Sequence, residues 1–408
     1  MIGGASQRPT RGLVAVLSLC AVMAACAAVA PITPPAASPK PGPSARTVPR
    51  IVHVPLSACA PFFAANVSVG GQSFRLLVDT GSTTTAVASA SCSNCGPVGT
   101  SGGYQPGPNV PRSQTTASTT YGGGSGKGWS GPVLEDSVSL DGLSVAPSVK
   151  LVAIESQSGI LNVCEGSGTR HQGILGLGPT FGAMPGTNGF LDQLRATGSV
   201  PDVFAIELCP FSAARGHLWL GGFDPSYATA APSYTPMTER GLVQMSDLSV
   251  GGASVGLPDG AYGDVLVDSG SPVTQLPSPV FAALTAAIES SASFKTLLGN
   301  DPGWSIWHGC APIPLSFAEA KAQFDALLPP LAITFGKAPS SITIRAPASE
   351  SYLRPAIRHG KTMWCSGIVE AKGKPDFIVL GSPIMEANIT IFDRQNRRVG
   401  FAPPKPCE

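Results

Sequence analysis

Residues 77–82 read Leu-Val-Asp-Thr-Gly-Ser, and residues 266–271 read Leu-Val-Asp-Ser-Gly-Ser. A second pair follows in the same order: residues 174–178 read Ile-Leu-Gly-Leu-Gly, and residues 378–382 read Ile-Val-Leu-Gly-Ser. The aspartates of the first pair lie 189 residues apart. Stacked short repeats recur about every 20 to 50 residues, whereas two units of this length predict two lobes of similar architecture. Two lobes imply a cleft between them.

The composition narrows the class of protein. Of the 408 residues only 12% are charged, and 26 basic against 25 acidic residues leave a formal net charge of +1. The chain lacks the basic excess of nucleic-acid-binding proteins, so we expect no nucleic-acid partner. The 48 glycines and 40 prolines favour short strands and turns over long helices. The expected fold class is all-β, with a few short helices.

Hydrophobic periodicity locates the main elements. Strands are predicted at residues 62–69, 74–78, 133–140, 204–208, 217–220, 265–267, 331–335 and 388–392. Helices are predicted at residues 189–195, 278–290 and 317–328.

Residues 1–30 have the pattern of a secretory signal, with two arginines before an apolar run at 13–25. The run is too short to span a bilayer comfortably. Two cleavage sites compete. A signal peptidase would cut near Ala27 or Ala30, whereas a bacterial lipoprotein signal would be cut just before Cys26, which would then carry a lipid anchor. Both interpretations predict a secreted or extracytoplasmic protein, either free or tethered to a membrane.

Residues 31–50 consist mainly of Pro, Ala, Ser and Thr, which predicts a semi-extended tether before folded structure begins near Ile51. Of the ten cysteines, Cys20 is lost with the signal and Cys26 is lost or acylated. An even number, eight, remains in an oxidising compartment, which predicts four disulfides.

The repeated aspartates carry the predicted chemistry. Each ends an apolar strand, where the following Gly lets the backbone approach closely and neighbouring hydroxyls can donate to the carboxylate. If the two turns face each other, like-charge repulsion prevents both carboxylates from staying ionised. The two groups then share one proton. Such a pair contains a base for a bound water and an acid for a substrate carbonyl. This arrangement can hydrolyse an amide without a metal, so we expect no metal or other cofactor.

The sequence resembles the pepsin-like aspartic proteases from about Ile51 to Cys407. The resemblance rests on the two Asp-Thr/Ser-Gly-Ser motifs, on residues 173–178, and on the closing segments at 377–381, 391–394 and 398–402. It implies a bilobal pepsin-like acid protease fold, with an N-terminal lobe over residues 51–225 and a C-terminal lobe over residues 226–408. It also implies an aspartic endopeptidase that acts on a peptide or protein substrate, and we expect a monomer.

The resemblance assigns roles to the residues of the two turns. Asp79 and Asp268 are the implied catalytic pair, and Ser82 and Ser271 are implied to hydrogen-bond their outer carboxylate oxygens. Thr80 and Ser269 are implied to cross-link the turns. Gly81 and Gly270 complete the active-site support.

Residues 120–128 resemble the flap, a hairpin that closes over bound peptide. Tyr121 matches the flap tyrosine that forms part of the pocket for the P1 side chain, and Gly122 and Gly123 match backbone groups that bind substrate. The alternative role of Tyr121 is hairpin packing. Where many relatives have a tryptophan that bonds this tyrosine, the chain has Ala86, and we considered Trp129 as its partial substitute.

The same resemblance implies disulfides Cys92–Cys95, Cys310–Cys365 and Cys209–Cys407, the last resembling an interlobe bridge of the memapsins. Cys59 and Cys164 remain as the fourth pair. As an alternative, Cys92 and Cys95 form a Cys-x-x-Cys motif that is compatible with a redox site or half of a zinc site.

Two other functions stay open. One is a non-catalytic binding or inhibitor protein on the same scaffold. The other is a serine hydrolase through Ser254, because residues 252–256 read Gly-Ala-Ser-Val-Gly. A helix should follow such a nucleophile, but a Pro-Asp-Gly turn follows, which favours a hairpin. The five histidines show no metal-ligand spacing, and scattered loop or surface positions are expected for them.

Overall fold

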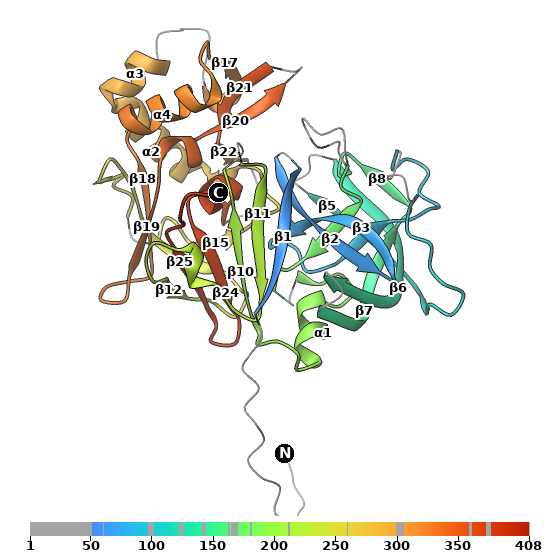
Figure 1. The fold of residues 1–408 in the computed structure, drawn as a ribbon. Helices are drawn as coiled ribbons and strands as arrows, with labels where there is room; N and C mark the ends of the chain where they lie inside the picture. Colours follow the sequence, from blue (N-terminus) through green and yellow to red (C-terminus); the bar gives the residue numbers. More distant parts are fainter. Residues whose placement is uncertain are drawn as a thin grey trace, which may run out of the picture. The chain divides into compact units, whose positions relative to one another are not determined.

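The computed structural model describes residues 51–59, 61–96, 102–121, 126–140, 144–161, 164, 170–179, 182–210, 213–258, 260–298, 306–358, 361–372 and 377–407 (Figure 1). All of these residues belong to one unit of the chain, Val48–Glu408. The predicted signal, the tether and Cys26 lie outside the described residues. No helix within the described ranges is both long and apolar enough to cross a membrane.

The chain forms many strands and few helices, as the sequence predicts. The strands of the first half are β1 (Val52–Cys59), β2 (Phe62–Val69), β3 (Gln72–Asp79), β4 (Ala86–Ala88), β5 (Arg112–Tyr121), β6 (Lys127–Leu140), β7 (Ser144–Ile154), β8 (Ser156–Ser158), β9 (Gly173–Gly176), β10 (Val203–Leu208) and β11 (Arg215–Leu220). Those of the second half are β12 (Ser233–Pro236), β13 (Val243–Val250), β14 (Ala253–Ser254), β15 (Asp264–Val267), β16 (Thr274–Pro277), β17 (Cys310–Pro312), β18 (Leu331–Phe335), β19 (Ile342–Ala346), β20 (Leu353–Arg358), β21 (Lys361–Ser366), β22 (Ile368–Ala371), β23 (Ile378–Leu380), β24 (Ile389–Asp393) and β25 (Arg398–Ala402).

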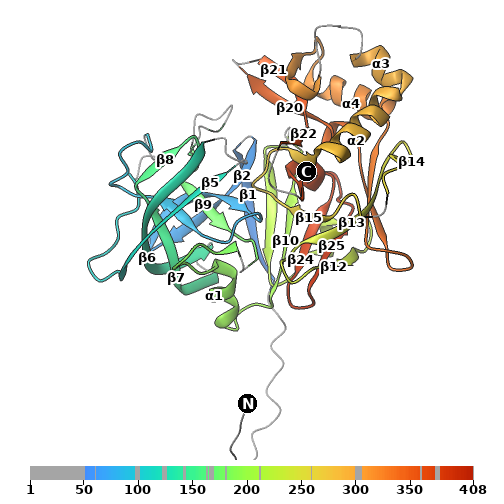
Figure 2. The same ribbon diagram turned by 180° about the vertical axis from the view of Figure 1, so that it is seen from behind.

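The helices are short. They are α1 (Phe190–Ala196), α2 (Ser278–Ser290), α3 (Ala292–Leu298), α4 (Phe317–Leu327) and α5 (Ser382–Glu386), with 3₁₀ turns η4 (Pro225–Tyr227), η5 (Ile306–His308) and η6 (Ala348–Glu350). A capping box begins α4, where Ser316 accepts from the Glu319 N–H and Glu319 accepts from the Ser316 N–H. Figure 2 shows α2, α3 and α4 beside β20 and β21. There Phe317 and Phe324 pack against Trp364 of β21, with ring centroids 5.5 and 4.8 Å away.

Both repeats fold into the same four-strand pattern. In the first, β3 runs parallel to β9, β9 is antiparallel to β4, and β4 is parallel to β7. In the second, β15 runs parallel to β23, β23 is antiparallel to β16, and β16 is parallel to β22. The internal repeat in the sequence is therefore a repeat of topology, and the all-β bilobal prediction is confirmed.

A 14-stranded sheet extends beyond the first repeat. Its order is β12-β25-β24-β10-β11-β1-β2-β3-β9-β4-β7-β6-β5, with β8 added beside β6. The late strand β24 thus pairs with β10, and Phe204 of β10 stacks on Phe392 of β24 at 4.6 Å between centroids. We propose that the lobes divide near residues 225 and 226, with this shared sheet connecting them.

Candidate active site

Asp79 is the last residue of β3 and lies opposite Gly176 in the parallel pair with β9. Asp268 directly follows β15, and its N–H donates to the Leu380 carbonyl of β23 at 2.9 Å. The apolar residues before Asp79 are buried, and so are Val265 and Val267 before Asp268, so burial of the strands fixes where both carboxylates emerge. The repeated topology brings the two strand ends together.

Four hydrogen bonds between Thr80 and Ser269 and their opposite turns hold the two strand ends against each other. The Thr80 hydroxyl donates to the Val267 carbonyl at 2.8 Å, and the Ser269 hydroxyl donates to the Val78 carbonyl at 2.8 Å. In return, the Thr80 N–H donates to Ser269 Oγ at 3.1 Å, and the Ser269 N–H donates to Thr80 Oγ1 at 2.9 Å. Only 2% and 1% of these two residues is exposed, so both hydroxyls are fully used inside the protein.

Gly81 and Gly270 allow the carboxylates to approach the opposite turn. A Cβ on Gly81 would lie 2.4 Å from Asp268 Cγ, and a Cβ on Gly270 would lie 2.3 Å from Asp79 Oδ1. Each glycine N–H donates to the Oδ1 of its own turn's aspartate at 2.8 Å. Any side chain at either position would therefore displace the opposite carboxylate.

The carboxyls of Asp79 and Asp268 interact directly. Burial raises the pKa of Asp268 well above its ordinary value of 3.8, and the charge of Asp79 and a hydrogen bond to Asp79 raise it further. Asp268 is nevertheless partly exposed, because it lines the cavity described below. A proton held by Asp268 and shared with Asp79 follows from this arrangement.

The serines that follow the two turns differ from each other. The Ser82 hydroxyl donates to Asp79 Oδ2 at 2.5 Å, as the resemblance implies. The Ser271 hydroxyl instead donates to the Val273 carbonyl at 2.7 Å and accepts from Gln275 at 3.3 Å. Because a hydroxyl has one proton, Ser271 does not donate to Asp268, and that part of the sequence prediction is wrong.

A cavity of about 310 Å³ opens beside the two aspartates. Its lining residues come from β2, β3, the flap hairpin, the β8–β9 segment and the second turn: Phe62, Leu77, Asp79, Tyr121, Lys127, Gly159, Ile160, His171, Ile174, Asp268, Gly270, Ser271 and Pro272. Most of this wall is apolar, with the carboxyls at one side. The cavity can therefore take an apolar side chain next to a polar group that reaches the carboxyls.

The flap strands β5 and β6 carry a contact that replaces the missing tryptophan. Trp129 Nε1 donates to the Tyr121 hydroxyl at 3.0 Å, and burial and the charge of Asp79 raise the pKa of that hydroxyl. Trp129 and the fully buried Ala86 belong to one apolar cluster, against which Tyr121 packs. The suggested partial substitution of Trp129 for the missing tryptophan is confirmed by this hydrogen bond. Gly122 and Gly123 lie outside the described residues.

The prediction of loop or surface positions for the histidines is wrong for His217, whereas His171 lies in a loop but is buried. His171 is buried, with 1% exposed, and its Nε2 lies 2.6 Å from the Ile160 carbonyl. Its ring meets Phe62 edge-on, and burial lowers its pKa. His217 lies on β11, partly buried, and its Nδ1 lies 2.8 Å from Nε2 of His53. Spacing along the chain gave no sign of either environment, because both depend on strands that meet only in the fold.

The serine-hydrolase motif forms the expected hairpin. Ser254 lies on β14, which pairs with β13, and its exposed hydroxyl donates to Asp247 Oδ1 at 2.6 Å. A strained strand-to-helix turn, which such a nucleophile requires, is not formed here.

Comparison with known proteins agrees with this geometry. The family model described as eukaryotic aspartyl protease matches residues 62–404. The chain belongs to this family. It is an aspartic-type endopeptidase, and so a hydrolase.

The sequences of three curated relatives align with most of the protease. It is 29% identical over 339 residues to an aspartic protease of Phaffia rhodozyma, covering 82% of this chain and 75% of the relative. It is 28% identical over 380 residues to a beta-secretase of Strongylocentrotus purpuratus, covering 85% and 67%. It is 26% identical over 353 residues to pepsin A-5 of Mus musculus, covering 83% and 80%.

Three disulfides of the protease match the predicted pairs: Cys92–Cys95, Cys209–Cys407 and Cys310–Cys365. The Cys92–Cys95 bond leaves no thiolate for zinc, whereas the redox alternative stays open, because a redox-active Cys-x-x-Cys forms the same bond when oxidised. Cys164 is also disulfide-bonded, and the side chain of its predicted partner, Cys59, lies outside the described part of the chain.

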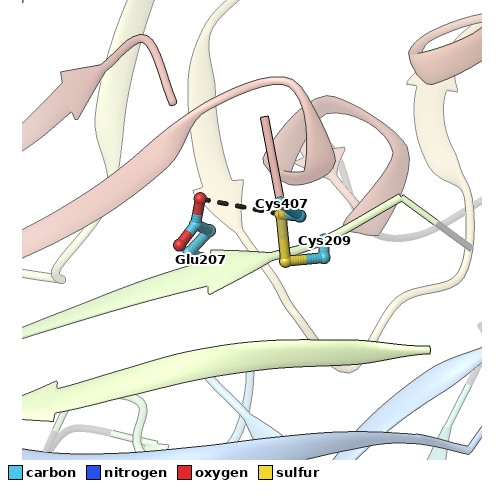
Figure 3. A group of neighbouring side chains, drawn as sticks. All are labelled: Glu207, Cys209 and Cys407. Atoms are coloured by element: carbon cyan, nitrogen blue, oxygen red, sulfur yellow. Dashed lines mark hydrogen bonds between the residues drawn. A yellow bond between two sulfur atoms is a disulfide. The ribbon is translucent and has the colours of Figure 1, made fainter. Parts of the chain in front are cut away.

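Within the described ranges, one group of side chains has the spacing of metal ligands: Glu207, Cys209 and Cys407 (Figure 3). The two sulfurs are bonded to each other, however, and a disulfide offers no thiolate to a metal. Glu207 Oε1 lies 3.8 Å from Cys407 Sγ. The three side chains are therefore a disulfide and a neighbouring carboxyl, and the disulfide joins the end of β10 to the C-terminal segment.

Replacing Glu207 by Gln is expected to stabilise the protease above neutral pH. Glu207 is 3% exposed, its Oε2 lies 3.9 Å from Nε2 of His217, and burial raises its pKa from 4.5 to about 7. The stability that its bound proton provides is present below pH 4.5 and is lost as the pH rises through about 7. Burial lowers the pKa of His217 from 6.5 to about 4, so its contribution has the opposite sign and is lost as the pH falls through that range.

Thermal melting at pH 4 and pH 8 tests this prediction. Glu207→Gln should melt at a higher temperature than the parent at pH 8 and close to the parent at pH 4. Glu239→Gln, at an exposed position, is the control. A constant difference between parent and Glu207→Gln at both pH values would show that the carboxyl does not titrate as proposed.

The sequence analysis did not assign eight residues of the cavity wall to the site: Phe62, Leu77, Lys127, Gly159, Ile160, His171, Ile174 and Pro272. Lys127 had a usable signal, because a residue six positions after Tyr121 in a hairpin can lie opposite it. The others come from strands and turns whose place at the cavity depends on the fold.

Proposed function

We propose that the protease hydrolyses peptide bonds by activating a water molecule between Asp79 and Asp268. The observation that carries this proposal is the direct contact of the two carboxyls at the wall of an open cavity, with the pKa of Asp268 raised by burial and by its neighbour. One partner then carries a proton while the other is charged. Such a pair supplies an acid and a base in the same place.

Each proton has an assigned place in the proposed reaction. The water oxygen attacks the scissile carbonyl carbon, its proton moves to Asp79, and the proton of Asp268 moves to the carbonyl oxygen. When the tetrahedral diol breaks down, Asp79 gives its proton to the leaving nitrogen and a diol hydroxyl returns a proton to Asp268. The pair ends with one proton, as it began.

The surrounding residues hold this pair in place. Thr80 and Ser269 fix the two backbones, Ser82 orients Asp79, and the glycine N–H groups orient the inner carboxylate oxygens. We also propose that Tyr121 covers the carboxyls during reaction and that the backbone of Gly122 and Gly123 binds the extended substrate, in the manner of strand addition.

Proteolysis by the purified protease tests the proposal. We expect cleavage of a denatured protein at acidic pH, and inhibition by a peptide in which a statine-type hydroxyl replaces the scissile carbonyl, because it resembles the tetrahedral diol. Cleavage that persists in a saturating concentration of this analogue would contradict the proposal.

Replacing Trp129 by Phe is expected to lower kcat without unfolding the protease. The change removes the hydrogen bond to Tyr121 but keeps most of the apolar contact, so the flap tyrosine loses its fixed position. We expect a fall in kcat/KM of about 5- to 20-fold, corresponding to a hydrogen bond worth about 1 to 1.5 kcal/mol plus some misplacement. Steady-state kinetics on one peptide measures it. Trp219→Phe, in the separate cluster of β10, β11 and β24, is the control for loss of a buried indole. An unchanged kcat/KM in Trp129→Phe would contradict the positioning role.

We further propose that the protease acts outside the cytoplasm, since three of its disulfides are formed and an oxidising compartment favours them. Mass spectrometry of the mature N-terminus would distinguish cleavage near Ala27 or Ala30 from a lipidated Cys26.

A further inference from the structure

The inner face of the flap carries a lysine as well as the tyrosine. Tyr121 of β5 lies directly opposite Lys127 of β6, and Thr119 lies opposite Trp129. Because alternate residues of a strand share a face, Lys127 and Trp129 project to the same side of the hairpin as Tyr121. Tyr121 lines the cavity, and so does Lys127.

Gly159 lets the lysine side chain lie along the cavity wall. Gly159 follows β8, which pairs with β6 at Gly128 and Ser158, and it has a φ of 63°. A Cβ on Gly159 would lie 3.3 Å from Cγ of Lys127 and 3.7 Å from both Cδ and Cε. The lysine stem therefore crosses the glycine, where any larger residue would press against it.

The ammonium of Lys127 is available to a bound molecule. Lys127 is exposed, and within the described ranges no carboxylate lies within 4 Å of its Nζ. The other titratable side chains of the cavity are Asp79, Asp268, Tyr121 and His171. Both aspartates are engaged with each other and with their own turns, and Lys127 is not among the groups that shift the pKa of Asp268.

Charge and shape together indicate which substrates fit. The wall formed by Phe62, Leu77, Ile160 and Ile174 is apolar, and the single lysine stands at its exposed side. An extended peptide turns every second side chain to the same wall. A peptide could thus place one apolar side chain in the cavity while a carboxylate on the same face reaches the ammonium.

We propose that Lys127 is a specificity-determining residue that selects peptides with an acidic side chain on the face turned to this wall, either at the residue that enters the cavity or two residues from it. The proposal rests on the proposed function, because the peptide must lie in the cleft for cleavage. The ammonium of Lys127 and the substrate carboxylate would form an exposed ion pair. This pair affects which substrate is chosen and does not take part in the chemical step.

Paired peptides test this inference. Starting from one cleaved peptide, each position is replaced in turn by Glu and by Gln, and kcat/KM is measured for each pair. We expect Glu to be preferred over Gln by about two- to fivefold at one of the proposed positions, the range of an exposed ion pair. The preference should grow between about pH 3 and pH 6, since the Glu carboxyl ionises near 4.3 while Lys127 stays charged. Added salt should weaken it.

Variants of Lys127 complete the test. Lys127→Gln should lose the preference for Glu over Gln, and Lys127→Glu should reverse that preference. Lys150→Glu, which makes the same charge change at an exposed site of β7 outside the cavity, should keep the parent preference.

Two results would overturn the inference: equal rates for Glu and Gln at every position in the parent, or an unchanged Glu preference in Lys127→Gln. Equal losses on Glu and Gln peptides in Lys127→Gln would also contradict it, because the lysine would then act on the aspartate pair. These results differ from failure of the proposed function, in which the Gln peptides are not cleaved by the parent.

Discussion

Replacing Asp79 or Asp268 by Asn is expected to lower kcat/KM for acid proteolysis by at least about 10³-fold, at the upper part of the range for loss of a general acid or base. Asn has the shape of Asp but cannot exchange a proton. With Asp79→Asn the pair loses the group that accepts the proton of water, and with Asp268→Asn it loses the group whose raised pKa keeps a proton for the substrate carbonyl. Steady-state cleavage of one peptide at acidic pH measures both losses.

Asp224→Asn provides the matched control. Asp224 caps η4 by accepting from the Ser226 N–H at 2.9 Å, away from the cavity, and Asn caps equally well. It should retain parent activity. Residual activity above about one per cent in either active-site variant would contradict the assignment, since general acid–base catalysis of this kind contributes at least a factor of about 100.

Replacing Asp268 by Asn is also expected to raise the stability of the folded protease. Because the folded-state pKa of Asp268 lies above its ordinary 3.8, the stability that its proton provides is present below pH 3.8 and is lost as the pH rises through the folded-state pKa. Asp268→Asn cannot ionise, so it should melt at a higher temperature than the parent at pH 7 and near the parent at pH 3. An inactive variant that is also more stable would separate catalysis from folding. Lower stability at pH 7 would contradict the sign of this pKa shift.

Replacing Thr80 by Val is expected to destabilise the protease by about 2 to 6 kcal/mol. Val keeps the shape but removes the hydroxyl that donates to the Val267 carbonyl and accepts from the Ser269 N–H. Two buried backbone groups are left without partners, at about 1 to 3 kcal/mol each. Urea unfolding at a pH where the parent unfolds reversibly measures the loss.

Activity of Thr80→Val should also fall, because displacement of a reacting group by about 1 Å costs about 100-fold in rate. Ser269→Ala, which removes the equivalent pair of hydrogen bonds, should have a similar effect on stability. Thr116→Val, at an exposed position of β5, should be nearly neutral. A loss below about 1 kcal/mol in Thr80→Val would show that the two turns are held together mainly by strand packing.

The sequence predicted the features that depend on local pattern and on the repeat. The strand at Phe62–Val69 and the helix at Ser278–Ser290 were predicted with the bounds that the structure has, because their apolar periodicity and flanking residues are local signals. The meeting of Asp79 and Asp268 followed from the repeat, since equal lobes related by duplication bring equal turns together. The chain has Ala86 where many relatives have a tryptophan, and it has a tryptophan at position 129. The replacement of one indole by the other could therefore be suggested from the sequence.

Features that depend on three-dimensional neighbours were not predictable. The hydroxyl of Ser271 turns to the Val273 carbonyl because the second turn offers an acceptor there, although its motif is the same as that of Ser82. Burial of His171 arises from the approach of Phe62 and Ile160. Neither neighbour is close to it in the sequence.

The connection of β10 to β24 has a consequence for biosynthesis. The strand that completes the hydrogen bonding of β10 begins at Ile389, and the disulfide that secures the end of β10 needs Cys407. A growing chain leaves its exit channel from the N-terminus, so one edge of the first-made sheet stays unpaired until β24 and Cys407 have emerged. A nascent fragment that stops before Ile389 would therefore carry an open sheet edge in place of a working enzyme.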